Sequence, residues 1–245
     1  MEKNNLWKVE LYRFWHSKSI FIGMIIGCIG MFILASANSD AFMTDGVTSG
    51  NVNSVMKFAN IMLILLIAVT VSCYLGREFK CKTIHHEIMA GYKFCKICLT
   101  KTLTCGLFVP IMLLLCILLF FATEYGTFQE YSVKRIFFLF ILLCHICTST
   151  VMYTMLSGNG ALGGCFAFVR FTLLEVLFIC LMMLGLSSEI VNKFKCLFVM
   201  SQWSVVINTG SDIPAHFMVG IIITTVVEYV ILLLIAQWKA KIVDF

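Results

Sequence analysis

Charged side chains are scarce in this sequence, and their scarcity excludes most soluble folds. Only 13% of the 245 residues are Asp, Glu, Lys or Arg, whereas 60% are hydrophobic, and the mean hydropathy is +0.97. A water-soluble domain of this length needs far more polar surface, so the composition indicates an integral membrane protein. Internal repeats and low-complexity tracts are also absent from the sequence.

Long apolar runs occupy most of the chain. About 20 apolar residues cross the hydrocarbon core as a helix, whereas barrel strands alternate over about ten residues. We therefore predict six transmembrane helices, covering about 19–36, 54–75, 102–123, 135–156, 163–186 and 216–238. These spans leave no room for a soluble domain, so we expect one all-α transmembrane domain over residues 1–245.

The basic residues are unevenly placed between the predicted spans. Most lie before the first span, between the second and third, and after the sixth. This distribution is the positive-inside bias, and it places both termini in the cytoplasm. The net charge of +5 therefore reflects topology and does not indicate a nucleic-acid partner.

The first span permits a second interpretation. A basic start, an apolar run and the small residues Ala35-Ser36-Ala37 are typical of a cleaved secretory signal. The region before the run is long and rich in aromatic and acidic residues, which favours a retained helix.

Twelve cysteines raise the question of a metal site or a disulfide. Most lie inside predicted spans, where Cys behaves as a small apolar residue. Outside the bilayer core, Cys95 and Cys98 have ligand-like spacing near Cys81, His85 and His86. Because Cys95 and Cys98 border an apolar stripe where a helix enters the membrane, we favour packing and expect no metal site.

Catalytic motifs are incomplete. The segment Gly76–Thr83 approaches the phosphate-binding pattern GxxxxGK[ST], but Cys81 replaces the second glycine and no strand leads in. His85-His86-Glu87 lacks the second histidine of the HExxH motif. We therefore expect no catalytic residue and no cofactor in this chain.

Two stretches outside the spans have helical character. The first, residues 1–18, predicts an interfacial helix. Its apolar face comprises Trp7, Leu11, Phe14 and Trp15, and its polar face comprises Glu10, Arg13 and Ser17. The second, residues 187–215, is partly apolar and predicts short interfacial or re-entrant helices.

Four ionisable residues lie inside predicted spans: His145, Arg170, Glu175 and Glu228. Such groups are costly in the bilayer and usually pair. At 1.5 Å per residue, Arg170 and Glu228 lie roughly 10 to 12 Å from the inner side, and the other two roughly 12 to 14 Å from the outer side. We predict the pairs Arg170–Glu228 and His145–Glu175, which either fix helix packing or line a cargo path.

Two segments carry a resemblance to a known family. One is Glu10–Ser19, ELYRFWHSKS, and the other is Glu78–Lys101. The matching positions in the second segment are Phe79, Lys82, Thr83, Ile84, Gly91, Tyr92, Lys93, Ile97 and Lys101. With the six-span layout, these segments resemble permease subunits of ABC exporters of the ABC type-2 family. The nearest branch comprises the lantibiotic-immunity, bacitracin-resistance and peptide-export permeases of Gram-positive bacteria.

The resemblance implies that the second segment contains a coupling helix seated in a groove of an ATPase subunit. The implied contact runs from Glu78 to Tyr92, and the residues nearest the ATPase are Thr83, Ile84, Glu87, Ile88 and Gly91. The residue pattern agrees, because Ile84 and Ile88 share one helical face suited to an apolar groove. Gly91 then allows the chain to turn back toward the membrane.

The resemblance also implies partners and a location. Two ATPase subunits would bind ATP and Mg, and a second permease copy or a paralogue would complete the pore in a bacterial cell membrane. The cargo would be amphipathic or hydrophobic, such as an antimicrobial peptide, for immunity or for secretion. Two alternatives stay open: a membrane-embedded enzyme using His145, Glu175 and Glu228, and a sensor or scaffold bound to a histidine kinase.

Overall fold

The computed structural model describes residues 6–43, 49–124, 132–183, 195–207 and 212–242, and the regular elements within them are all helical. In chain order these are α1 (Leu6–Trp15), α2 (Lys18–Met43), α3 (Ser49–Lys80), α4 (Thr83–Met89), α5 (Phe94–Glu124), α6 (Val133–Ser157), α7 (Gly160–Phe168), the π-helix η2 (Val169–Leu173), α8 (Leu174–Met183), α10 (Val199–Ile207) and α11 (Ala215–Ile242).

Among the described residues, five stretches of helix are long and apolar enough to cross a membrane. They are Asn60–Lys80, Phe94–Leu118, Val133–Ser157, Gly160–Leu177 and Ala215–Lys239. In α2, the apolar stretch Lys18–Gly27 is shorter than a span. The all-helical class is therefore confirmed with five candidate spans, and the sixth stays a prediction.

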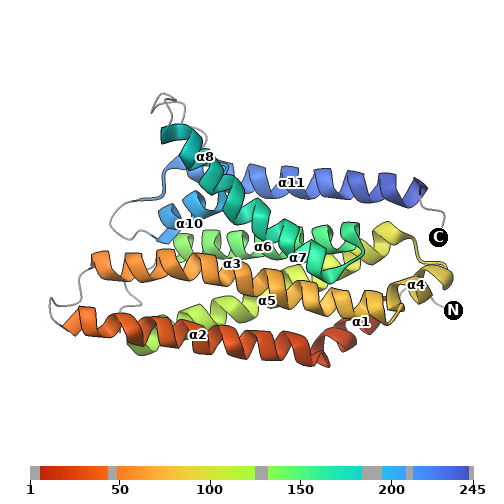
Figure 1. The fold of residues 1–245 in the computed structure, drawn as a ribbon, viewed down its shortest axis with the longest axis horizontal. Coiled ribbons are helices and arrows are strands. Elements are labelled where there is room, and N and C mark those ends of the chain that lie inside the picture. The colour runs from red at the N-terminus through yellow and green to blue at the C-terminus, as the bar shows by residue number, and fades with distance from the viewer. Residues whose placement is uncertain (1–5, 44–48, 125–131, 184–194, 208–211, 243–245) are drawn as a thin grey trace.

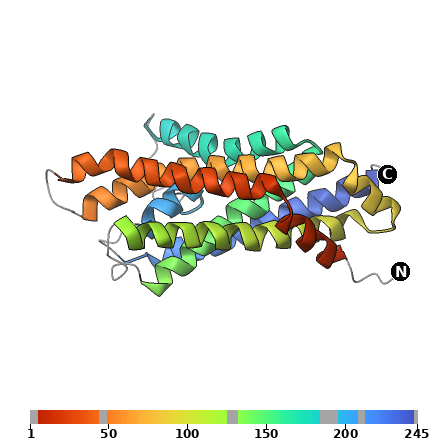
Figure 2. The same cartoon turned by 90° about the horizontal axis from the view of Figure 1, so that it is seen from below.

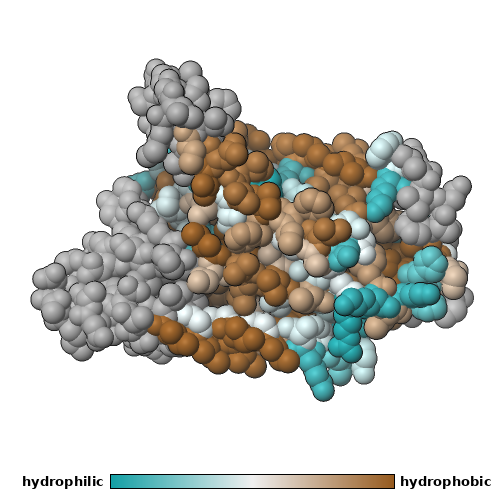
Figure 3. Space-filling model, viewed as in Figure 1, coloured by the Kyte–Doolittle hydropathy of each residue, from teal (hydrophilic) through white to brown (hydrophobic). Residues whose placement is uncertain are grey.

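The long helices run side by side along the longest axis of the molecule (Figures 1 and 2). Helices α1 and α4 lie at the same end, and α11 finishes there as well (Figure 1). Apolar residues cover the middle of the bundle in this view, and hydrophilic residues gather toward the α4 end (Figure 3). We name this the α4 end of the bundle.

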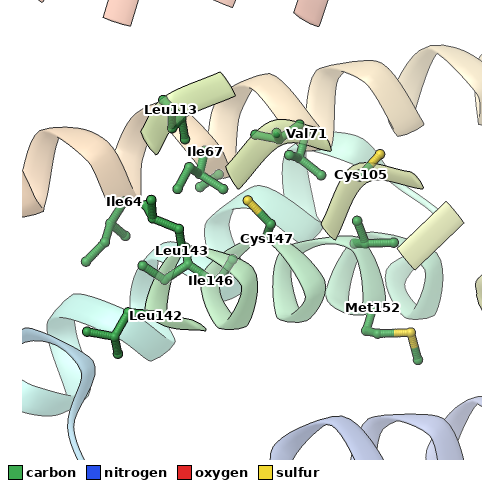
Figure 4. Packing of buried hydrophobic residues seen from close by; sticks show 14 of the residues in the cluster. Ile64, Ile67, Val71, Cys105, Leu113, Leu142, Leu143, Ile146, Cys147 and Met152 are labelled. Carbon is green, nitrogen blue, oxygen red and sulfur yellow. The ribbon is translucent and has the colours of Figure 1, made fainter. Parts of the chain in front are cut away.

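The core is built around α6, which packs against α3, α5, α7 and α11. Figure 4 shows its buried side chains facing those of α3 and α5. The residues concerned are Ile64, Ile67 and Val71 of α3, Cys105 and Leu113 of α5, and Leu142, Leu143, Ile146, Cys147 and Met152 of α6. Cysteine thus serves here as a small apolar core residue, as predicted.

Glycines bring α3 and α7 into backbone contact. A Cβ atom on Gly160 would lie 2.4 Å from the carbonyl oxygen of Ser72 and 2.8 Å from Cα of Gly76. A Cβ atom on Gly164 would lie 2.7 Å from Oγ of Ser72. Small residues allow such close approach between membrane helices, where van der Waals packing replaces the hydrophobic effect.

A tight turn joins α6 to α7 at the α4 end, between the predicted fourth and fifth spans. Gly158 has a φ of 68° at the end of α6, a conformation that favours glycine. Asn159 then caps α7, since its side-chain oxygen accepts the Ala161 N–H at 2.9 Å. This turn fixes α6 and α7 as an antiparallel hairpin.

Helix α10 lies in the segment 187–215, for which the sequence predicts short interfacial or re-entrant helices. It packs against α3 and α6, and Gln202 and Trp203 are fully buried. The Gln202 amide nitrogen donates to the carbonyl oxygen of Cys196 at 2.6 Å and to Thr224 of α11 at 3.2 Å. Helix α10 therefore belongs to the bundle core.

Candidate functional site

Helix α4 is a single short helix between two membrane-type helices. The chain leaves α3 through Lys82, which has a left-handed backbone with a φ of 55°. The helix ends at Met89, Ala90 is its C-cap residue, and Gly91 follows with a φ of 87°. Backbone N–H groups of Gly91 and Tyr92 donate to the carbonyls of Ile88 and Glu87, which completes a glycine C-terminal turn. The predicted break at Gly91 is confirmed.

The two faces of α4 differ from the sequence expectation. Ile84 and Glu87 are buried, and Ile88 and Thr83 are half-buried. The exposed face comprises His85, His86 and Met89, with Met89 70% exposed.

Glu78 is buried as well. Ile84 joins the protein's own apolar core with Phe94, and the carboxylates of Glu78 and Glu87 pair with cations of the same chain. The predicted contact of these three residues with an ATPase stays a prediction. Tyr92 is half-buried against the same core, and Gly91 is exposed.

A buried charge cluster lies behind α4, and Lys101 is at its centre. The Lys101 side chain is fully buried in α5. Its Nζ atom donates to Glu10 Oε1 at 2.8 Å and to Glu78, and lies 4.0 Å from Glu87 Oε2. Arg13 extends the cluster, because its guanidinium donates to Glu10 at 2.9 Å and to Glu87.

The cluster joins α1, α3, α4 and α5. Three carboxylates and two cations leave one formal negative charge in excess, and one oxygen each of Glu10, Glu78 and Glu87 is buried without a hydrogen-bond partner. Burial raises the pKa of Glu87, while the charges of Lys101 and Arg13 act in the opposite direction. Breaking a buried pair of this kind strands a charge, so the cluster holds α4 firmly against the other three helices.

The cluster corrects two predictions. Glu10 does not lie on the polar face of α1; it shares a buried stripe with Leu6 and Phe14, while Trp7 and Trp15 are partly exposed. Lys101 was predicted to lie just before the third span, but it lies inside α5. The spacing of Leu6, Glu10 and Phe14 at intervals of four was the signal available in the sequence.

A second polar group lies within the bundle, around Glu228 of α11. Its carboxylate accepts from Arg170 Nη2 at 3.0 Å and from the Tyr153 hydroxyl at 3.0 Å. His145 Nε2 lies 3.3 Å from Glu228 Oε2. The Arg170–Glu228 pair was predicted because the two residues lie at similar depths in the membrane. Arg170 lies in the π-helix η2, and π-bulges occur frequently at functional sites.

The predicted His145–Glu175 pair is wrong. Glu175 instead accepts the backbone N–H of Met200 at 2.9 Å and the hydroxyl of Ser201. These atoms lie in the first turn of α10, where an acceptor satisfies free N–H groups. The sequence alone could not place α10 beside Glu175, so depth in the membrane suggested the wrong partner. Glu175 consequently does not join His145 and Glu228 in one polar group.

Cysteines and histidines do not gather into a metal centre in the part of the chain that the structure describes. Cys98 packs in the apolar core, and Cys95 is half-buried in α5. The cysteines whose side chains the structure describes are free thiols.

No protein-family model matches this chain, and no curated protein matches it. The fold and the site define its class. Over the residues that the structure describes, the protein is all-helical, with five helices long and apolar enough to cross a membrane and a short helix held at one end by buried charges.

Proposed function

We propose that this chain is the permease subunit of a bacterial ABC exporter. Helix α4 carries the proposal, because it is a short helix at the end of the bundle with an outward face of His85, His86 and Met89. The segment that contains it is one of the two that resemble ABC type-2 permeases. Two separate ATPase subunits supply ATP binding and hydrolysis, and a second permease subunit completes the transporter.

The buried charge cluster supports a coupling role for α4. Arg13 binds α4 to α1 through Glu87, and Lys101 binds α5 to α1 and α3 through Glu10 and Glu78. A displacement of α4 by an ATPase therefore moves α1, α3 and α5 together instead of bending one loop. Separating α4 from these helices would leave buried charges unpaired, which is costly.

The cargo in this proposal is amphipathic or hydrophobic, such as an antimicrobial peptide. A cavity of about 440 Å³ supports it, lined by Tyr153, Phe166, Val169 and Arg170 among others. The cavity combines apolar walls with the Arg170 side chain, which is 26% exposed. Apolar walls with a few polar groups are typical of sites for such molecules.

The test is a mild-detergent pulldown of the tagged protein from its native cells, with ATPase activity assayed in the eluate. We compare wild type with His85→Asp/Met89→Asp, which changes only exposed side chains of α4, and with the exposed control Lys134→Asp at the opposite end. We expect at least a tenfold loss of copurified ATPase in the α4 variant and none in the control.

Absence of an ATPase from the wild-type eluate overturns the transporter proposal. Equal ATPase recovery with the α4 variant overturns α4 as the docking surface. Size-exclusion profiles of all three proteins exclude misfolding as the cause of a loss.

A further inference from the structure

A groove between α3 and α7 opens on the side of the bundle and ends among basic residues. Its volume is about 620 Å³. Leu65, Val69 and Phe168 give it apolar walls, and small residues such as Ala68 and Gly164 form its floor. The backbone contact between Gly76 and Gly160 explains this shape, since neither helix projects a side chain there.

Arg77 and Lys80 line the groove where it reaches the α4 end. Both are exposed, and no carboxylate among the described residues forms an ion pair with either. Glu78 lies between them in sequence, but it faces the interior and binds Lys101. Because residues three apart share one face of a helix, both cations can reach one ligand in the groove. The groove thus has a positive end without a counter-charge.

The apolar part of the groove matches one leaflet of a bilayer in length. From Leu65 to Gly76, α3 rises about 16 Å at 1.5 Å per residue. Half of a hydrocarbon core about 30 Å thick is about 15 Å. An acyl chain that fills the groove therefore brings its headgroup to the level of Arg77 and Lys80.

We propose that this groove is a binding site for an anionic phospholipid. One acyl chain lies between α3 and α7, and the phosphate group binds Arg77 and Lys80. Basic pockets between membrane helices on the cytoplasmic side have the chemistry that binds acidic headgroups. The site is independent of the exporter proposal, because it requires only that the bundle spans a membrane.

The first test removes the charge. The protein is placed in phosphatidylcholine nanodiscs that contain a minor share of phosphatidylglycerol, and lipids retained after extraction are counted by native mass spectrometry. A cation near an anionic surface contributes about fivefold in affinity, so Arg77→Gln/Lys80→Gln should weaken phosphatidylglycerol retention about 30-fold. The control Lys8→Gln/Lys93→Gln removes two exposed cations outside the groove and should retain the lipid.

The second test fills the groove. Cys165→Trp places a large side chain in the groove, while Cys180→Trp changes an exposed cysteine of α8 outside it. Only Cys165→Trp should abolish retention of phosphatidylglycerol. In wild type, phosphatidylglycerol should also slow maleimide labelling of Cys165, and soluble glycerol phosphate should not.

Three results overturn the proposal. Equal retention of phosphatidylglycerol and phosphatidylcholine by wild type would mean that the groove holds only unselected lipid. Protection of Cys165 by soluble phosphate would show an anion site without a lipid. Cross-linking of two copies through Cys165, independent of lipid, would show that a second copy covers the groove.

Discussion

At the scale of one residue, Lys101 shows how the bundle stabilises a buried charge. A fully buried ammonium group is stable only because Glu10 and Glu78 accept its hydrogen bonds. Each of these carboxylates depends in turn on a cation, since their remaining oxygens are buried without partners. The cluster is therefore sensitive to the loss of any one member.

Lys101→Met should destabilise the protein by about 3–5 kcal/mol, because it removes one partner of a buried charge pair. Thermal unfolding in detergent measures this loss. The exposed Lys93→Met is the matched control and should change stability little. Adding Glu78→Gln to Lys101→Met should restore part of the stability, and a further loss would contradict this account of the cluster.

At the scale of elements, the contact between α3 and α7 depends on the absence of side chains. The Cβ atom of an alanine at position 160 would meet the backbone oxygen of Ser72, which cannot move aside as a flexible side chain can. Gly160 and Gly164 have the small-xxx-small spacing typical of close membrane helices. The groove beside this contact exists for the same reason.

Gly160→Ala should cost about 1–3 kcal/mol, the usual penalty for overpacking. Gly30→Ala is the matched control, since nothing lies within 4 Å of an added Cβ atom there. The control should be neutral or stabilising by up to about 1 kcal/mol, because alanine favours helix over glycine. Equal melting temperatures of the two variants would contradict the backbone contact.

A carboxylate also positions α10, the short helix in the bundle core. Glu175→Leu removes the acceptor for Met200 N–H and the Ser201 hydroxyl, which should cost about 1–2 kcal/mol as a lost helix cap does. Hydrogen exchange of the amides of α10 should then accelerate about tenfold. Glu175→Gln keeps one acceptor oxygen and should show a smaller change. Unchanged exchange in Glu175→Leu would exclude the capping role.

At the scale of the whole molecule, α1, α4 and the end of α11 lie together at one end of the bundle (Figure 1). We propose that this end lies in the cytoplasm, since basic residues concentrate there as the positive-inside rule expects. Lys134, at the start of α6, lies at the opposite end and marks the outer side of the proposed orientation.

This orientation can be measured with an impermeant maleimide on intact cells, resolved by peptide mass spectrometry. Exposed Cys81, beside α4, should stay unlabelled until the cells are opened. The thiol introduced by Lys134→Cys should react in intact cells, because that position is exposed at the other end. The reverse pattern would invert the topology and remove α4 from the cytoplasm.

The helical class, the places of most long helices and the break at Gly91 could all be predicted from the sequence. These features follow from apolar length and local backbone preference, which neighbouring residues decide. Depth along the membrane also identified Arg170 and Glu228 as partners.

Tertiary structure alone decided which face of each helix is covered. Ile84 looked available for a partner and Glu10 looked like a surface charge, yet both are buried by helices distant in sequence. Glu175 was assigned to His145 because the position of α10 beside Glu175 could not be foreseen. The physical reason is that apolar patterning in a membrane protein marks lipid-facing and protein-facing sides alike, so only the packed bundle distinguishes them.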